Sequence, residues 1–230
     1  TEAQDFYGLI VMDRREATIG ILKGTLVQLL HHMTSGVPGK QKAGGQSAMR
    51  FARIREGLAK EFYKRISEAV NKEFLGKKEI KGIIIGGPGP TKEEFMEYLN
   101  NEIKKKIIAV KDITYTDEFG LNNLVEASQD ALAKEAIAEE RKLLLEFFTK
   151  LAQSPDKIAY GYENVKKALE YGAVEKLILV DTLDDKIIDE FDNLATESNT
   201  ELFLVSTDIQ EGKQLRDLGG IGAILRFAIQ

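Results

Sequence analysis

The sequence predicts an α/β protein, in the α+β sense, with two mixed-sheet domains that are each a β-sheet covered by helices. Short apolar runs typical of strands alternate with longer segments whose apolar residues recur every three or four positions, as in helices. The length of 230 residues suits two domains of about 100–130 residues each. Residues 1–130 carry 20 Lys+Arg and 18 Asp+Glu, against 12 and 19 in residues 131–230. This asymmetry indicates domains with different partners, and we place their boundary at residue 130.

The first predicted elements are strands. Residues 7–12 and 17–22 are apolar runs joined by the polar segment 13–16, which is typical of a hairpin, and residues 25–30 form a third predicted strand. Regular structure is expected to stop between Thr34 and Gln46, where the sequence holds four Gly and one Pro. That composition favours a surface loop.

A long helix is predicted after this loop. One apolar stripe runs along it, and we expect the whole stripe to lie in the core: Phe51, Ile54, Leu58, Phe62, Ile66, Val70 and Phe74. Gly76 is a natural end to the helix. Beyond it we expect a buried strand at residues 82–86, a helix with a capped start at Thr91, a strand at residues 107–113 and helices across residues 121–151.

The remaining sequence alternates between helices and strands. We expect helices at residues 163–171, 184–195 and 209–218, each followed by a strand, at residues 176–180, 201–205 and 223–227. This alternation predicts a second sheet covered by helices.

Composition excludes several classes of protein. The sequence has no Cys, which excludes disulfides, thiolate metal sites and a Cys nucleophile. The two His residues, His31 and His32, are adjacent, and we interpret them as residues near a strand end rather than as metal ligands. No window approaches the roughly 18 apolar residues of a membrane span. We therefore expect a soluble, cytoplasmic protein that needs no metal and no cofactor.

The segment around the glycine-rich loop points to a binding partner. Between Gly36 and Arg55 the sequence has no acidic residue, although acidic residues outnumber basic ones in the whole chain. The basic residues of this segment are Lys40, Lys42, Arg50, Arg53 and Arg55. Arg50 and Arg53 are three positions apart, so they share a helix face. The pattern indicates contact with the phosphate backbone of a polyanion rather than recognition of a base sequence.

Gly44-Gly45-Gln46 lies in the middle of this basic segment. Two consecutive glycines allow positive φ and remove side-chain atoms, so the backbone can approach another molecule closely. The Gln46 amide offers a donor and an acceptor but no titratable proton, which excludes general acid–base catalysis. We infer that such a tip presents an N–H group and an amide to developing charge, or positions a water, in the active site of another molecule.

A known family carries a similar segment. Residues 40–53, KQKAGGQSAMRFAR, closely resemble the signature of the class I peptide chain release factors of archaea and eukaryotes. The resemblance continues through VKDI at residues 110–113, YGAVE at residues 171–175 and GGIGAILR at residues 219–226, so it covers nearly the whole chain. Three letters recur by chance, but the basic flanks and the later stretches make the resemblance specific.

The resemblance implies a part in translation termination. Residues 1–130 would be the middle domain, whose Gly44, Gly45 and Gln46 enter the ribosomal peptidyl transferase centre and trigger hydrolysis of the peptidyl-tRNA ester. The residues that would hold large-subunit RNA or the tRNA acceptor end are Lys40, Lys42, Arg50 and Arg53. In the family the Gln is a methylation target, which would be Gln46.

The resemblance also implies the partners of the second domain. Residues 131–230 would bind a translational GTPase and, in recycling, an ABC-type ATPase. Most of the rate enhancement would come from the ribosome, so the chain would be a release factor rather than a free-standing enzyme. Neither DNA nor a membrane would be a partner.

Two departures from the family pattern matter. The N-terminal domain that reads the stop codon is absent from this sequence, which begins at Thr1 without Met, so we expect a fragment. Val180 and Glu201 are separated by little more than one predicted helix. We therefore expect the small insertion of the family's C-terminal domain to be missing.

Other functions remain open. A codon-independent ribosome-rescue hydrolase would use the same Gly-Gly-Gln without reading a codon. A non-catalytic ribosome-binding relative, as in no-go decay, lacks Gly-Gly-Gln, which speaks against it here. A nucleotide-binding enzyme would use residues 86–92, GGPGPTK, but this segment departs from the phosphate-loop pattern and its prolines lack N–H donors. We interpret it, and GGIG at residues 219–222, as turns.

Overall fold

The computed structural model describes residues 5–36 and 45–229. The chain forms two compact units that divide between Leu132 and Ala133, within helix α5 (Gln129–Gln153). The predicted fold class is confirmed, since each unit is a mixed β-sheet covered by helices. Within the described ranges, no helix has the length and hydropathy needed to cross a membrane.

The first unit is built on a five-stranded sheet with the order β3-β2-β1-β4-β5. Its strands are β1 (Phe6–Met12), β2 (Glu16–Lys23), β3 (Leu26–Thr34), β4 (Ile80–Gly87) and β5 (Ile107–Asp112). β2 pairs antiparallel with β1 and β3, whereas β4 pairs parallel with β1 and β5. The predicted hairpin is confirmed, and β3 continues past its predicted end at residue 30.

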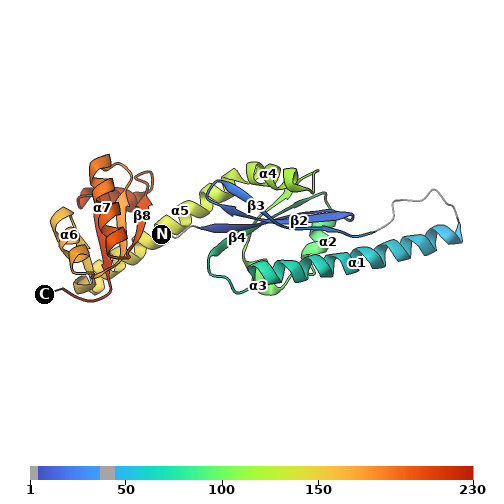
Figure 1. Ribbon diagram of the computed structural model, residues 1–230, viewed down its shortest axis with the longest axis horizontal. Coiled ribbons are helices and arrows are strands. Elements are labelled where there is room, and N and C mark those ends of the chain that lie inside the picture. The colour runs from blue at the N-terminus through green and yellow to red at the C-terminus, as the bar shows by residue number, and fades with distance from the viewer. Residues whose placement is uncertain (1–4, 37–44, 230) are drawn as a thin grey trace. The chain divides into compact units, whose positions relative to one another are not determined.

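Helices cover both faces of this sheet. α1 (Gln46–Phe74), α2 (Thr91–Met96) and α3 (Asn101–Lys105) lie on one face, and α4 (Glu118–Ala127) lies on the other (Figure 1). Successive side chains along a strand therefore point to opposite faces of the sheet and pack against different helices. Ile10 and Met12 pack on the α1 side, whereas Leu9 and Val11 pack under α4. Because both faces are covered, β1 is apolar along almost its whole length.

Helix α1 confirms the predicted long helix, but only its second part lies in the core. Its buried apolar residues are Ala59, Phe62, Tyr63, Ile66, Val70 and Phe74. Phe51 and Ile54 are 39% and 45% exposed, and Leu58 is half-buried. The prediction that these three residues belong to the core is wrong, because the helix extends past the strands (Figure 1). We call residues 45–58, which are the N-cap residue and the first part of α1, the arm.

The segment between β4 and α2 is a turn around a buried lysine. Lys92 is 3% exposed, and its ammonium group pairs with Asp112 and Glu93. The predicted turn is therefore confirmed. The predicted capped start at Thr91 is wrong, because Pro90 occupies the N-cap position without a side-chain cap and its carbonyl accepts the first helical hydrogen bond, from Glu94.

The second unit contains a four-stranded sheet with the order β6-β9-β7-β8. Its strands are β6 (Ile158–Tyr160), β7 (Val174–Val180), β8 (Glu201–Val205) and β9 (Ile221–Leu225). β7 and β8 are parallel, and β9 is antiparallel to β6 and β7. The strand at residues 201–205 is confirmed. β6 was not predicted, because three residues are too few to show a period.

Helices also cover both faces of the second sheet. α6 (Tyr162–Glu170) and α7 (Asp185–Glu197) pack on one face, and α5 and α8 (Gln210–Asp217) pack on the other. A 3₁₀ turn, η1 (Pro155–Lys157), leads from α5 into β6. The last predicted strand is displaced: β9 begins at Ile221 rather than at residue 223, because Gly219 and Gly220, both at positive φ, complete the turn directly before it. Of the predicted turn at residues 219–222, Ile221 and Gly222 belong instead to β9.

Candidate functional site

The arm begins at a glycine whose conformation other residues avoid. Gly45 is the N-cap residue of α1, with φ 85° and ψ −155°, a region that is essentially restricted to glycine. A Cβ atom on Gly45 would meet no described atom within 4 Å. The need for glycine therefore comes from the backbone conformation and not from packing. Gln46 is the first residue of the helix, and its side chain is exposed.

The same end of α1 favours negatively charged ligands. The first N–H groups of a helix have no acceptor within the helix, and the helix dipole places partial positive charge there. The first turn contains no acidic residue. Gln46, Arg50 and Arg53 are spaced so that they share one face. Both arginines are exposed, and within the described part of the chain neither forms an ion pair.

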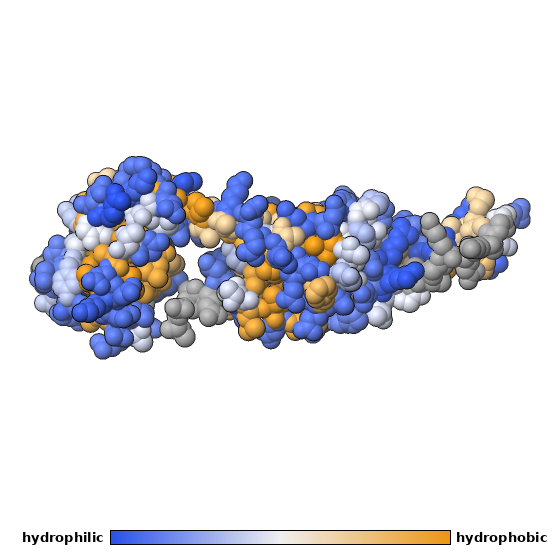
Figure 2. Space-filling view, turned by 90° about the horizontal axis from the view of Figure 1, so that it is seen from above, coloured by the Kyte–Doolittle hydropathy of each residue, from blue (hydrophilic) through white to orange (hydrophobic). Residues whose placement is uncertain are grey.

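Apolar side chains accompany the arginines. An open hollow on the arm is lined by Gln46, Met49, Arg50, Arg53 and Ile54. Met49 is 63% exposed, and Phe51 and Ile54 are the two exposed residues of the predicted stripe. Figure 2 shows hydrophobic surface beside hydrophilic surface at this end of the first unit. Exposed apolar side chains gathered in this way indicate a surface that is buried in a complex.

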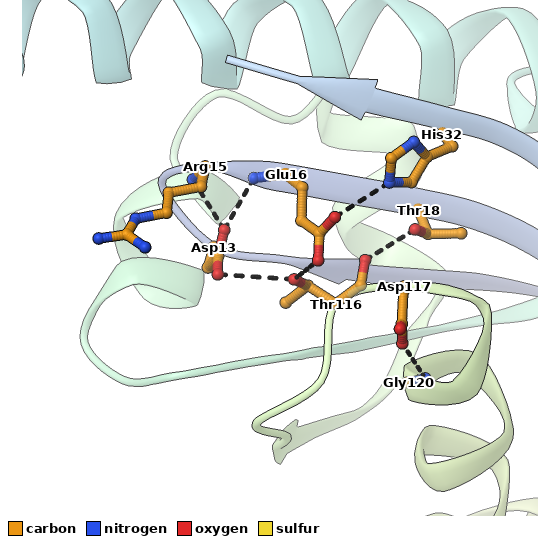
Figure 3. Close-up of polar contacts among 8 residues, drawn as sticks. All are labelled: Asp13, Arg15, Glu16, Thr18, His32, Thr116, Asp117 and Gly120. Carbon is orange, nitrogen blue, oxygen red and sulfur yellow. Dashed lines mark hydrogen bonds and ion pairs between the residues drawn. The ribbon is translucent and has the colours of Figure 1, made fainter. Parts of the chain in front are cut away.

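The base of the arm lies beside the turn between β1 and β2. Asp13 Oδ1 accepts hydrogen bonds from the N–H groups of Arg15 and Glu16, at 2.7 and 2.8 Å. The Thr116 hydroxyl donates to Glu16 Oε1 at 2.7 Å, and His32 Nε2 lies 3.0 Å from Glu16 Oε2 (Figure 3). The turn is thus held by β3 on one side and by the segment before α4 on the other.

Arg14, in the same turn, is a candidate that the sequence analysis misses. Its Nη1 atom donates to Glu56 Oε1 at 2.7 Å, and its Nη2 atom lies 3.6 Å from Glu94 Oε2. Glu56 belongs to the arm and Glu94 to α2. One signal was present in the sequence: Glu56 is the first acidic residue after the acid-free segment that ends at Arg55. No local spacing could have named Arg14 as its partner.

The predicted site residues fall into two groups. Gly45, Gln46, Arg50 and Arg53 come together on the arm. Lys40, Lys42 and Gly44 lie outside the described residues.

The two histidines take part in strand contacts. His31 and His32 both lie in β3, where His31 Nε2 is 2.7 Å from Glu73 Oε1 and His32 contacts Glu16. Among the residues that the structure describes, no group of three or more His, Asp and Glu side chains is arranged to hold a metal ion.

Comparisons with known proteins match both units. A family model described as eRF1 domain 2 matches residues 6–134, and one described as eRF1 domain 3 matches residues 137–229. The peptide chain release factor subunit 1 of Thermococcus kodakarensis is 40% identical over 279 residues, which cover 99% of this chain and 67% of the relative. That of Methanobrevibacter smithii is also 40% identical, over 275 residues with the same coverage. The chain spans about two thirds of these relatives.

The alignment with the Thermococcus protein is longer than the chain itself, at 279 against 230 residues. The relative therefore carries residues inside the matched region that have no counterpart here. In the structure, β7 and β8 are connected by α7 and short turns.

Two solved structures with TM-scores above 0.5 share the fold of this chain, and a third is similar in sequence. A chain in a structure described as a model of ribosome-bound archaeal Pelota and ABCE1 aligns with a TM-score of 0.66 and 24% identity, over 100% of this chain and 63% of that chain. Dom34 of S. cerevisiae aligns with a TM-score of 0.56 and 23% identity, over 97% and 63%. The archaeal translation termination factor aRF1 is 30% identical over 97% and 63%, with a TM-score of 0.49.

The assignment rests on the sequence matches. Two domain models together span almost the whole chain in the order in which they are numbered, and curated relatives share 40% identity over 99% of it. The chain therefore belongs to the eRF1 family of peptide chain release factors, with matches to domains 2 and 3.

Proposed function

We propose that the chain acts in translation termination by placing Gly44-Gly45-Gln46 in the ribosomal peptidyl transferase centre, where it promotes hydrolysis of the peptidyl-tRNA ester. The observation that carries this proposal is the position of Gly45 and Gln46 at the exposed end of the arm, within the match to eRF1 domain 2. An arm that extends past its own sheet can reach a reaction centre inside another molecule.

The two glycines would allow close approach to the substrate. The backbone conformation of Gly45 is one that a residue with a Cβ atom adopts only under strain. A side chain at either glycine would also add atoms where the arm meets the peptidyl-tRNA. We assign Gly44 to the same role because it is adjacent in the motif.

Gln46 would act without exchanging a proton. A water oxygen attacks the ester carbonyl carbon, the bond to the tRNA 3′-oxygen breaks, and a water proton ends on that oxygen. The Gln46 amide and the N–H groups of the first turn of α1 would stabilise the negative charge that develops on the carbonyl or leaving oxygen. The helix dipole would add to this effect. In other enzymes the loss of one such donor costs about 10²–10³-fold in rate.

The basic residues would bind RNA around the reaction centre. Arg50 and Arg53 share the exposed face of Gln46 and are free of ion pairs within the described residues, so their charge is available to phosphates. Lys40 and Lys42 would extend this contact to large-subunit RNA or the tRNA acceptor end. The ribosome and peptidyl-tRNA are therefore the proposed partners of the first unit.

The second unit would bind the proteins that deliver and recycle the factor. We assign a translational GTPase and an ABC-type ATPase to residues 131–230. The match to eRF1 domain 3 supports this assignment, as does the fold shared with a Pelota described as ribosome-bound together with ABCE1. The proposal places the chain in the cytoplasm, where ribosomes translate.

Codon-independent ribosome rescue is the second candidate. The fold shared with Dom34, described as a translation termination-like factor involved in RNA quality control, favours it. A non-catalytic role is less well supported, since the sequence contains Gly-Gly-Gln at residues 44–46.

One release assay separates the candidates. Ribosomes with labelled peptidyl-tRNA and a stop codon, a sense codon or no codon in the A site are mixed with the chain or its Gln46→Ala variant. Gln46-dependent release on every codon supports rescue. No release by the chain alone, restored on stop codons by fusing the codon-reading domain of a curated relative before Thr1, supports termination. No release in either form refutes both.

A further inference from the structure

The direction of the arm must be set at its base. The first fully buried residue of α1 is Ala59, and before it the helix has no core packing among the described residues. A helix held at only one end can tilt where it leaves the core. The contacts that the arm makes just before Ala59 therefore decide where Gly45 and Gln46 point.

The contact at that place is made by Arg14. Its guanidinium group lies between two carboxylates, 2.7 Å from Glu56 on the arm and 3.6 Å from Glu94 on α2. The side chain of Arg14 is about one-third exposed, so the guanidinium group is partly shielded from solvent. Of the ion pairs that the structure describes, Arg14–Glu56 is the one that joins the arm to the rest of the first unit.

The second carboxylate is tied back to α1. The Tyr63 hydroxyl donates to Glu94 Oε2 at 3.4 Å. Burial raises the pKa of Tyr63 to about 12, and the Glu94 carboxylate adds to this shift against the opposing effect of Arg14. The hydroxyl therefore stays protonated and remains a donor at neutral pH. Through Glu94, contacts thus link Arg14 in the turn to α2 and to Tyr63 in the core part of α1.

The turn also holds the first residue after β3. Ser35, directly after β3, donates its N–H group to the Arg15 carbonyl at 2.8 Å and its hydroxyl to the Arg14 carbonyl at 2.6 Å. The backbone of the turn is itself fixed by the Asp13 and Glu16 contacts of Figure 3. Arg14 therefore reaches the arm from a rigid support that also fixes the residue before Gly36.

We propose that Arg14 is a positioning residue that fixes the direction of the arm through Glu56. It touches neither Gly45 nor Gln46 and acts only through α1. Its effect on peptide release rests on the proposed function, whereas its effect on the direction of the arm does not. Because exposed ion pairs contribute little to global stability, loss of Arg14 should change the direction of the arm far more than the thermal stability.

A distance measurement tests the direction of the arm. The chain has no Cys, so Met49→Cys on the arm and Lys81→Cys on β4 give two unique sites for spin labels, and both positions are exposed. Pulsed electron resonance then reports the distribution of the distance between the labels. We expect Arg14→Ala and Glu56→Gln each to broaden or shift this distribution. The double variant should show no larger change than either single variant. Arg14→Lys should restore the wild-type distribution in part.

The matched control is Arg15→Ala. Arg15 is in the same turn, its side chain is exposed, and Figure 3 shows it pointing away from the neighbouring contacts. Its backbone N–H group, which donates to Asp13, is retained in alanine. Arg15→Ala should give the wild-type distribution. A wild-type distribution for Arg14→Ala, or equal broadening by both variants, would overturn the proposal.

Release kinetics separate this proposal from the proposed function. With a saturating amount of the form that releases peptide, the chain or its fusion, Arg14→Ala should lower the maximal rate of release by up to about 10²-fold, the effect of misplacing a reacting group by about 1 Å, while Arg15→Ala leaves it unchanged. A broadened distribution with a wild-type maximal rate refutes the functional part of the proposal. If Gln46→Ala also releases peptide at the wild-type rate, the proposed function itself has failed.

Discussion

Replacing Gly45 by alanine tests most directly whether peptide release needs the backbone conformation of this residue. The backbone of Gly45, at φ 85° and ψ −155°, lies in a region that costs a residue with a Cβ atom about 1–3 kcal/mol. Space is not the obstacle, because the added methyl group would meet no described atom within 4 Å. Within the chain itself, the penalty is therefore conformational. If the reaction needs this conformation, the rate should fall by about 5- to 160-fold, at 1.36 kcal/mol for each factor of ten.

Global stability should respond differently. The arm has no core packing before Ala59, so a change in its first turn is relieved locally and need not reach the core. We expect Gly45→Ala to unfold within a few degrees of the wild-type temperature. On the ribosome the methyl group would also add atoms where the arm meets the peptidyl-tRNA. With both effects together, we expect Gly45→Ala to impair release at least as much as Gln46→Ala, by about 10²-fold or more. The assay is single-turnover release of labelled peptide from ribosomes at saturating chain, with thermal unfolding measured in parallel.

Gly57→Ala is the matched control. Gly57 is also on the arm and also has open space at its Cβ position, but its φ is not positive. An added methyl group there should stabilise the helix by about 0.5–1 kcal/mol and leave release unchanged. Wild-type release by Gly45→Ala would refute the reasoning, and so would equal losses in both variants.

Arg50→Gln and Arg53→Gln should each reduce the slope of log affinity for ribosomes against log salt by about 1, because each would lose one phosphate contact. Asp112→Ala should destabilise the first unit more than Lys92→Met in urea unfolding. The Lys92 side chain is 4% exposed and would keep only Glu93 as its partner, whereas the Asp112 side chain, 88% exposed, stays hydrated when Lys92 is replaced. Glu140→Gln should raise the unfolding temperature at pH 7 but not at pH 4.

The sign of the last prediction follows from the pKa of Glu140. Burial raises this pKa, and nearby Asp181 and Asp208 raise it further, against a hydrogen bond from the Ser206 N–H group that lowers it. The folded state therefore binds the proton more tightly than the unfolded state, so stability falls as pH rises from the unfolded to the folded pKa. Above both values the penalty is complete. Glutamine removes the charge and can still accept from Ser206.

Each of these three predictions has an outcome that would contradict it. The phosphate-contact prediction is wrong if the Arg50 and Arg53 variants keep the salt slope of the wild type, or if Arg216→Gln in the second unit lowers this slope as much. The ion-pair argument fails if Lys92→Met is the more damaging change. The pH argument fails if Glu140→Gln lowers the unfolding temperature at pH 7, or if its effect is the same at both pH values.

The repeating pattern of apolar residues predicted the elements well but not the limit of the core. Phe51 and Ile54 continue the stripe of Phe62 and Ile66 without a break, and a period of 3.6 residues shows which side of a helix is apolar, not what covers it. The sheet ends before the helix does. The exposed part of the stripe is thus a feature of tertiary structure that no window of sequence contains.

Short elements and long-range contacts could not be predicted from the sequence, for related reasons. β6 has three residues, too few for a period, and it gains its place by pairing with β9. The Arg14–Glu56 pair joins residues 42 positions apart. The candidate residues Gly45, Gln46 and Arg50 could be predicted because composition alone marks them, through adjacent glycines and an acid-free basic segment.

The most direct test of the central claim compares the chain with Gln46→Ala in single-turnover peptide release, using the form of the factor that releases peptide and measuring ribosome binding in the same samples. The account predicts that Gln46→Ala binds ribosomes as the wild type does and releases peptide about 10²–10³-fold more slowly. Equal release by the two proteins at equal occupancy would contradict it.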